Sequence, residues 1–284
     1  MATRKIDNFE LRLVPMGVAH IPRLHELSIA VNWPHRPEDW AAALSLGEGV
    51  VALDEIDRPV SSAMFFPVGR DIATIGMVIT SPRLQDQGAA GWLMGEMLRR
   101  TKGHVRRLNA TKAAYRLYVS LGFQPVAEVY QHQGIARAPT GHDARVRPLE
   151  GADRDRICDV DLRAYGSDRS RFIDHFLATA EGTVLESDGG LTGYALCHRF
   201  GRGHVLGPVV AVCEEDAVAL IRPLIAAHRG AFLRMDTRMV GGPLQAALEA
   251  AGMSFFDTVT TMQLGATAPP AGPAVYGLAG HAFG

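Results

Sequence analysis

Apolar residues in the first half of the chain alternate between strand-like runs and helical spacing. Three β-prone runs, at 49–54, 61–68 and 72–80, predict strands because they are apolar and rich in β-branched residues. The charged, Pro-containing segment 55–59 between the first two runs is typical of a hairpin turn. We therefore expect the first two strands to be antiparallel neighbours.

Helical spacing precedes and follows these runs. Residues 19–31 place Ile21, Leu24, Leu27 and Ile29 on one side of a predicted helix, which we expect to be buried. Further elements are predicted in chain order as a strand at 11–14, a polar, aromatic loop at 32–40, helices at 88–100 and 112–121, and an extended segment at 123–130.

These elements predict an α/β (α+β) protein with two similar units, each a mixed, mostly antiparallel central sheet flanked by helices. Residues 1–130 form the first unit, and the Gly- and His-containing segment 131–144 is the expected linker. Residues 145–264 repeat a similar order of elements. Residues 265–284, rich in Ala, Gly and Pro, predict a tail that either lies across a surface or is disordered.

Composition narrows the classes of function. The 284 residues carry a net charge of −1, so no overall basic field exists to bind a nucleic acid. Three well-separated cysteines predict a reducing, cytoplasmic environment and no metal site. The polar start of the chain and the lack of an apolar run of about 18 residues predict no membrane insertion.

Small residues stand at the start of the helix that follows the strand at 72–80. Gln85 is followed by Gly88, Ala89 and Ala90, and the first N–H groups of a helix are free to meet an anion. Small side chains there let a pyrophosphate approach the backbone. A capped surface helix is the alternative explanation of the same pattern.

The segment 78–90 resembles the acyl-CoA signature of the GNAT superfamily of acetyltransferases, Q/R-x-x-G-x-G/A. The resemblance implies acetyl-CoA as co-substrate, and no metal. It implies cofactor contacts from Val78, Ile79 and Thr80, on a strand that separates from its neighbour, and from Gln85, Asp86, Gln87, Gly88, Ala89 and Ala90. Gln85 stands where Arg is frequent and Asp86 where Gly is frequent, which places a carboxylate near the phosphates.

Residues 109–123 resemble the second GNAT signature, a helix that ends in Y-x-x-x-G-F. The family's matching tyrosine protonates the departing CoA thiolate, so the resemblance implies that Tyr118 is the general acid. A phenol with a pKa of about 10 suits that task. Tyr115 lies three residues earlier on the same helix and is the competing candidate. A packed aromatic residue is the structural alternative for Tyr118.

The loop at 32–40 lies where GNAT proteins border the acceptor site. Trp33, His35 and Arg36 are therefore the candidate acceptor contacts, and anchoring of the loop to the core is the alternative. A base that deprotonates the amine is required, but the sequence does not rank the acidic residues, and the base is unassigned.

The second half resembles the C-terminal GNAT-like domain of a group of bacterial acetyltransferases, through residues 164–169, 193–195, 206–211 and 248–252. Where a phosphate loop would lie, the chain has Glu214, Glu215 and Asp216, which would repel a pyrophosphate. We expect this half to be a wall of the acceptor site, an interdomain partner or a dimer contact, and a homodimer is left open. The charge groupings Asp168–Arg171 and Arg234–Arg238 are interpreted as solvated surface or local ion pairs.

The resemblance implies an N-acetyltransferase that transfers an acetyl group to a primary amine of a small-molecule or amino-acid-like acceptor by direct attack. The alternative function is a catalytically weak acyl-CoA-binding sensor or interaction module. Neither a nucleic acid nor a membrane is an expected partner.

Overall fold

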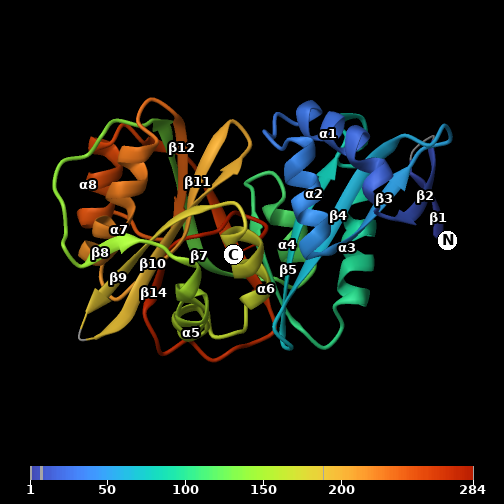
Figure 1. Ribbon diagram of the computed structural model, residues 1–284. Coiled ribbons are helices and arrows are strands. Elements are labelled where there is room, and N and C mark those ends of the chain that lie inside the picture. Colours follow the sequence, from blue (N-terminus) through green and yellow to red (C-terminus); the bar gives the residue numbers. More distant parts are fainter. Residues whose placement is uncertain (1, 7–8, 188, 284) are drawn as a thin grey trace.

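A computed structural model describes residues 2–6, 9–187 and 189–283. The elements of the first half lie on one side of the molecule and those of the second half on the other, with the end of the chain between them (Figure 1). The first half comprises β1 (Ala2–Ile6), β2 (Phe9–Pro15), α1 (Ile21–Ala30), α2 (Pro37–Leu46), β3 (Glu48–Leu53), β4 (Pro59–Val68), β5 (Ile72–Thr80), α3 (Ala89–Arg100), β6 (Val105–Ala110), α4 (Tyr115–Ser120) and β7 (Gln124–Ile135), with short 3₁₀ turns at Val18–His20 and Pro82–Leu84.

The second half repeats this succession of elements with fewer strands at its start. It comprises β8 (Val146–Pro148), a 3₁₀ turn at Gly151–Asp153, α5 (Arg154–Tyr165), α6 (Ser170–Leu177), β9 (Glu181–Ser187), β10 (Gly190–Phe200), β11 (Gly203–Ala211), α7 (Glu214–Ala227), β12 (Phe232–Thr237), α8 (Gly242–Ala250), β13 (Ser254–Leu264) and β14 (Ala274–Gly277).

One sheet runs through both halves in the order β1-β2-β3-β4-β5-β6-β13-β7-β12-β11-β10-β9-β8, with β14 paired to β11. Among the described strands, β5–β6 and β11–β12 are parallel and the other neighbours are antiparallel. The expected mixed, mostly antiparallel sheet flanked by helices is therefore confirmed.

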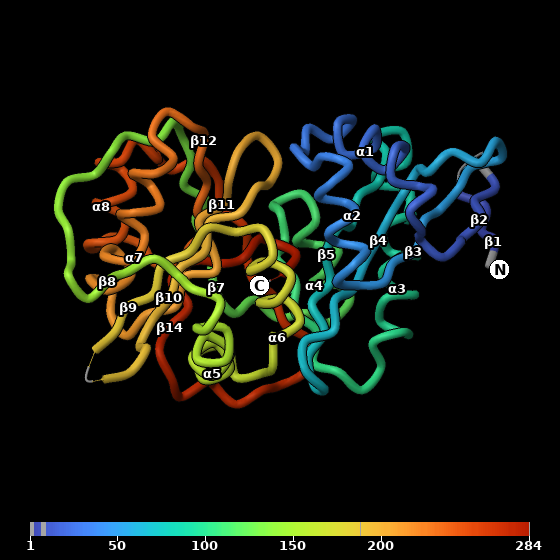
Figure 2. Tube along the Cα trace, in the orientation of Figure 1, coloured from blue at the N-terminus to red at the C-terminus, as the bar shows by residue number. Residues whose placement is uncertain are grey.

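The two halves exchange a strand. β13, from the end of the second half, lies between β6 and β7, and β7, from the first half, lies between β13 and β12. The trace in Figure 2 places β7 near the middle of the molecule. Each half therefore completes its sheet with backbone hydrogen bonds from the other half.

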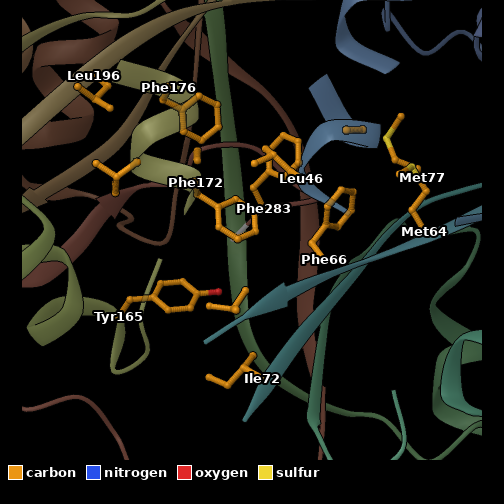
Figure 3. Close-up of a cluster of buried hydrophobic side chains, with 14 of the residues drawn as sticks. Leu46, Met64, Phe66, Ile72, Met77, Tyr165, Phe172, Phe176, Leu196 and Phe283 are labelled. Carbon is orange, nitrogen blue, oxygen red and sulfur yellow. The ribbon is translucent and has the colours of Figure 1, made fainter. Parts of the chain in front are cut away.

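The helices lie on both faces of the sheet. One core cluster joins α1 and α2 of the first half to α5 and α6 of the second, while α3 and α4 cover the opposite face of the first half. Phe283 enters the shared cluster, with its ring 5.1 Å from that of Phe66 and 6.1 Å from that of Phe172 (Figure 3).

Several expected elements differ from the structure. β7 continues to Ile135, so a connection begins five residues later than residue 131, because β12 and β13 both pair with those residues. The loop at 32–40 is shorter, since α2 begins at Pro37, and the side chain of Ile29 is 58% exposed instead of buried. In the tail, β14 pairs with β11, and Leu278 and Phe283 are buried.

No helix in the described part of the chain has the length and apolar character needed to cross a bilayer. Among the same residues, no group of three or more His, Cys, Asp or Glu side chains is placed to hold a metal ion.

Candidate active site

The predicted phosphate cradle forms the connection between β5 and α3. After the 3₁₀ turn, Asp86 and Gly88 have left-handed backbone angles, with φ of 62° and 88°, and Gly88 is the N-cap of α3. Residues 85–88 are exposed, Ala89 is buried and Ala90 is half-buried. The turn thus presents the start of α3 to solvent.

The cradle fits a pyrophosphate. A Cβ atom built on Gly88 would meet no atom within 4 Å, so the space beside this backbone is free for a ligand. The first N–H groups of α3 have no acceptor inside the helix and carry a partial positive charge. Gln85 and Gln87 donate their amide hydrogens to Thr80 O and Arg83 O, which helps to hold the turn.

β5 separates from β6, as the resemblance implies. Its parallel pairing with β6 includes Ile72, Ala73 and Thr74 and does not extend further along the strand, while its pairing with β4 continues to Thr80. A bulge with φ of 53° at Met77 interrupts the β4–β5 register, and Ser62 Oγ donates to Met77 O over 2.8 Å. The bulge lies immediately before Val78 and changes which backbone groups face the gap.

Tyr118 lies on α4, which follows β6. Its ring is 5% exposed and packs edge-on against Phe123 at 6.0 Å, and it lines a cavity described below. Burial raises the pKa of Tyr118, so the phenol stays protonated at neutral pH. Tyr115 is half-buried and packs against the cluster under α3.

A cavity of about 310 Å³, here called the central cavity, lies between the two halves. The first half supplies Trp33, His35, Val78 and Tyr118, and the end of the chain supplies residues 280–283. The second half and the exchanged strands contribute Gln131, Gln133, Phe200, Phe232, Arg234, Asp236, Phe256 and Asp257.

His35 contributes a neutral imidazole to this wall. Its carbonyl oxygen is 2.8 Å from His25 Nδ1, and its ring lies edge-on to that of Phe200 at 5.2 Å. Among the described residues, its Nδ1 is buried with no hydrogen-bond partner. Burial lowers the pKa of His35 to about 4, which nearby Asp39 only partly offsets.

Arg36, unlike Trp33 and His35, is not among the described residues that line the central cavity. Its guanidinium pairs with Asp39 at 2.7 Å, and Asp39 caps the start of α2 through Arg36 N. Asp39 Oδ2 also accepts a hydrogen bond from Gly201 N, which ties α2 to the β10–β11 turn of the second half. Asp39 lines the central cavity, so Arg36 holds one of its walls in place.

A buried ionic cluster faces the cavity from the second half. Asp236 is fully buried and pairs with Arg234 at 2.8 Å, and His281 Nε2 lies 3.4 Å from the same carboxylate. Burial would raise the pKa of Asp236, but Arg234 and His281 together hold it well below its usual value.

In the charge groupings of the second half, Asp168 and Arg171 are exposed as expected, but Arg169 and Asp236 are buried. Arg234 and Asp236 form the expected local pair, yet they are part of a cavity wall. Arg169 is also fully buried, paired with Asp161 at 2.6 Å and stacked on Tyr165. Glu214, Glu215 and Asp216 form the first turn of α7, where negative charge complements the helix dipole.

Among the predicted site residues, Trp33, His35, Val78 and Tyr118 meet at the central cavity. The cradle, Gln85–Ala90, lies at the start of α3, and Ile79 and Thr80 connect it to Val78 along β5. Sequence reasoning missed Asp236 as a cavity residue and did not consider His281. No local motif marks either, because both reach the cavity through tertiary packing.

Comparisons with known proteins agree with this architecture. Residues 32–139 and residues 157–277 each match a family model described as an acetyltransferase (GNAT) domain. The uncharacterized N-acetyltransferase YitH of Bacillus subtilis (strain 168) is 24% identical over 230 residues, which cover 79% of this chain and 81% of that protein.

Solved structures share the whole fold. A putative acetyltransferase from Pyrococcus horikoshii has a TM-score of 0.81 at 19% identity, covering 96% of both chains. A tandem GNAT protein from the clavulanic acid biosynthesis pathway has a TM-score of 0.63 at 13% identity, covering 91% of this chain and 100% of the other. The chain belongs to the GNAT acyltransferases, as a two-domain member with one GNAT domain in each half.

Proposed function

We propose that this protein transfers an acetyl group from acetyl-CoA to a primary amine of a small-molecule or amino-acid-like acceptor by direct attack. The observation that carries the proposal is the central cavity, where Tyr118 and the bulged part of β5 face residues of the second half. A cavity of about 310 Å³ is in the range of small-molecule sites.

The cradle at Gln85–Ala90 would hold the pyrophosphate, and Val78, Ile79 and Thr80 would hold the pantetheine arm. When bound, acetyl-CoA supplies an activated acyl thioester. Backbone N–H groups of β5 beyond the bulge would stabilise the carbonyl oxygen as it becomes negative. Tyr118 would donate its proton to the departing sulfur, for which a buried, protonated phenol is suited.

Trp33 and His35 are proposed to contact the acceptor from the first half. Their rings, with that of Phe200, form an apolar surface beside the proposed reaction centre. The second domain is proposed to act as a wall of the acceptor site and not as a second catalytic centre, because Glu214–Asp216, in the first turn of α7, would repel a pyrophosphate.

Two measurements on the full chain test the proposal. Calorimetry with acetyl-CoA should give one site per chain, and a panel of primary amines should include acceptors that release free CoA. Binding without CoA release from any amine would favour the alternative, a catalytically weak acyl-CoA-binding module. Absence of binding would reject both functions.

A further inference from the structure

Arg234, on β12, is fixed at the wall of the central cavity. Its Nε donates to Asp236 Oδ1 over 2.9 Å, and its Nη2 donates to Asp236 Oδ2 over 2.8 Å. Nη2 also lies 3.1 Å from His281 Nε2, which accepts because a guanidinium can only donate. The guanidinium carbon lies 5.9 Å from the centre of the Phe200 ring. These three partners line the same cavity.

One nitrogen of Arg234 has no partner in the described part of the chain. A guanidinium has five N–H donors, and the bonds to Asp236 and His281 use the one on Nε and the two on Nη2. Nη1 has no acceptor among the described residues, and it is not enclosed, since the fully buried unpartnered atoms there are all histidine nitrogens. The two N–H groups of Nη1 are therefore open to a ligand in the cavity.

Gln133, on β7, supplies a second open donor beside Arg234. The backbone register pairs these two residues directly, so their side chains project from the same face of the sheet with Cβ atoms about 5 Å apart. Gln131 donates to Gln133 Oε1 over 2.8 Å, which leaves Gln133 Nε2 as the donor end of the amide. Nε2 has no acceptor among the residues that the structure describes, and Gln133 lines the central cavity.

The charges around the cavity favour an anion. Three carboxylates line it, and each is paired with a cation: Asp39 with Arg36 at 2.7 Å, Asp236 with Arg234 at 2.8 Å, and Asp257 with Lys112 at 3.6 Å. Arg202, exposed on the β10–β11 turn, also lines the cavity and has no ion pair in the described ranges. One positive charge is therefore left without a counter-charge, which attracts an anionic group.

We propose that Arg234 Nη1 and Gln133 Nε2 bind a carboxylate of the acceptor, so that the acceptor is a primary amine that also carries a carboxylate. This inference rests on the proposed function, because it names the class of acceptor for the same cavity. Two neighbouring donors match the two oxygens of a carboxylate, and hydrogen bonds between charged groups are stronger than those between neutral groups. The subsite depends on the shared sheet, since β7 comes from the first half and β12 from the second.

The wall beside this subsite is apolar. Phe232 lies two positions before Arg234 on β12 and lines the cavity, and the His35 ring lies edge-on to Phe200 at 5.2 Å. Apolar surfaces of this kind bind the body of a ligand, while a few polar groups fix its orientation. An acceptor with an aromatic or aliphatic body between its amine and its carboxylate therefore fits this wall.

Pairs of acceptors that differ only in the carboxylate test the proposal on the wild type. 4-(Aminomethyl)benzoate, 4-aminobutanoate and β-alanine are compared with their carboxamides, which keep the amine and the length of each compound. Release of free CoA gives kcat/KM, and we expect at least one acid to exceed its carboxamide by about tenfold or more. Transfer to the carboxamides with no preference for any acid would overturn the proposal and leave the acetyltransferase function standing.

Gln133→Glu tests the subsite itself. The substitution keeps an acceptor for Gln131 but replaces the Nε2 donor with a negatively charged oxygen. We expect kcat/KM for the preferred acid to fall by about tenfold or more, while the value for its carboxamide stays near that of the wild type. Gln124→Glu, at an exposed position on the same strand, is the matched control and should affect neither compound. An equal fall for both compounds in Gln133→Glu would overturn the assignment.

The role of Arg234 is tested with a charge-balanced variant, because Arg234→Gln alone would leave Asp236 as an unpaired buried charge. The double variant Arg234→Gln/Asp236→Asn removes the ion pair and keeps polar side chains. Calorimetry with acetyl-CoA checks that it is folded, and its preference for the acid over the carboxamide should disappear. A preference at the wild-type level would overturn the role of Arg234. If the double variant does not fold, Gln133→Glu decides the proposal.

NMR of the Gln133 side-chain amide gives a readout that needs no transfer reaction. Its resonances, assigned by their loss in Gln133→Glu, should shift on addition of at least one of the three acids and not of its carboxamide. If the wild type releases no CoA with any amine, the proposed function fails. A shift with the acid alone would then still support the carboxylate subsite, and the absence of any shift would overturn the subsite as well.

Discussion

Thr261 Oγ1 donates a hydrogen bond to Asn109 Oδ1 over 2.7 Å, although 152 positions separate the two residues. The bond joins β13, near the end of the chain, to β6 of the first half. Asn109 also holds His281 through its amide nitrogen. One side chain therefore links the exchanged strand to the C-terminal segment that reaches the cavity.

The strand exchange predicts that the halves do not fold independently. A fragment of residues 1–144 would leave β6 without β13, and β7 without either of its neighbours, because both come from the second half. Unpaired strand edges favour association and loss of cooperative folding. We expect the fragment to aggregate or to lack a cooperative thermal transition by circular dichroism. Co-expression with residues 145–284 should restore a single soluble complex.

A monomeric fragment 1–144 with a sharp transition and full acetyl-CoA affinity would contradict this dependence. It would show that the first half forms a sufficient sheet without β13.

Gly88→Glu tests the cradle. The substitution places bulk and negative charge in the free space beside the start of α3, where the pyrophosphate would lie. We expect the Kd of acetyl-CoA to rise by about tenfold or more, which is about 1.4 kcal/mol. Isothermal titration calorimetry measures this change.

Gly88→Ala is the matched control, because φ of 88° strains any residue with a Cβ atom. If the alanine variant loses as much affinity as the glutamate variant, backbone strain explains the effect. Unchanged affinity in both variants would remove the cradle assignment.

Tyr118→Phe tests the general acid. The ring would keep its packing against Phe123, so acetyl-CoA affinity should remain near that of the wild type. Turnover should fall by about 10²-fold because the hydroxyl proton is lost. Steady-state kinetics at saturating acetyl-CoA measure it, and Tyr115→Phe should change turnover much less. Full turnover in Tyr118→Phe, with chemistry shown to be rate-limiting, would mean that another group protonates the sulfur.

The lowered pKa of His35 predicts that the stability of the protein depends on pH. Its pKa falls from 6.5 to about 4 on folding, so protonation favours the unfolded chain. The contribution of His35 to the free energy of unfolding is present at pH values above 6.5, where the ring is neutral in both states. This contribution is lost as the pH falls from 6.5 toward 4. Between pH 7 and 5 the loss is at most about 2 kcal/mol, and less if water in the cavity solvates the ring.

Urea unfolding measures this contribution if the free energy of unfolding is determined at pH 7 and pH 5 for the wild type and for each variant. The change between the two pH values is then compared from protein to protein. His35→Gln should lose less stability than the wild type over this interval, because the other buried histidines are common to both. His142→Gln, at an exposed position, should behave like the wild type. An identical loss in His35→Gln and the wild type would show that His35 does not carry the effect.

The sequence by itself determined the local elements and predicted the site residues that depend on them. The strand at 72–80 is β5, and the small residues from Gly88 to Ala90 are at the start of α3, because both depend on nearby residues. Tyr118 could be selected since its spacing to Gly122 and Phe123 is a local pattern at a helix end.

Only the tertiary structure decided how the halves share one sheet and one cavity. Backbone pairing of β7 with β12 and with β13 joins residues 97 or more positions apart, and no local pattern encodes which strand fills a gap. Asp236 is part of a short charged stretch in the sequence, and His281 is part of a Gly- and Ala-rich tail. They meet because burial of Phe283 and the bonds to Asn109 and Thr74 fix the end of the chain beside β12.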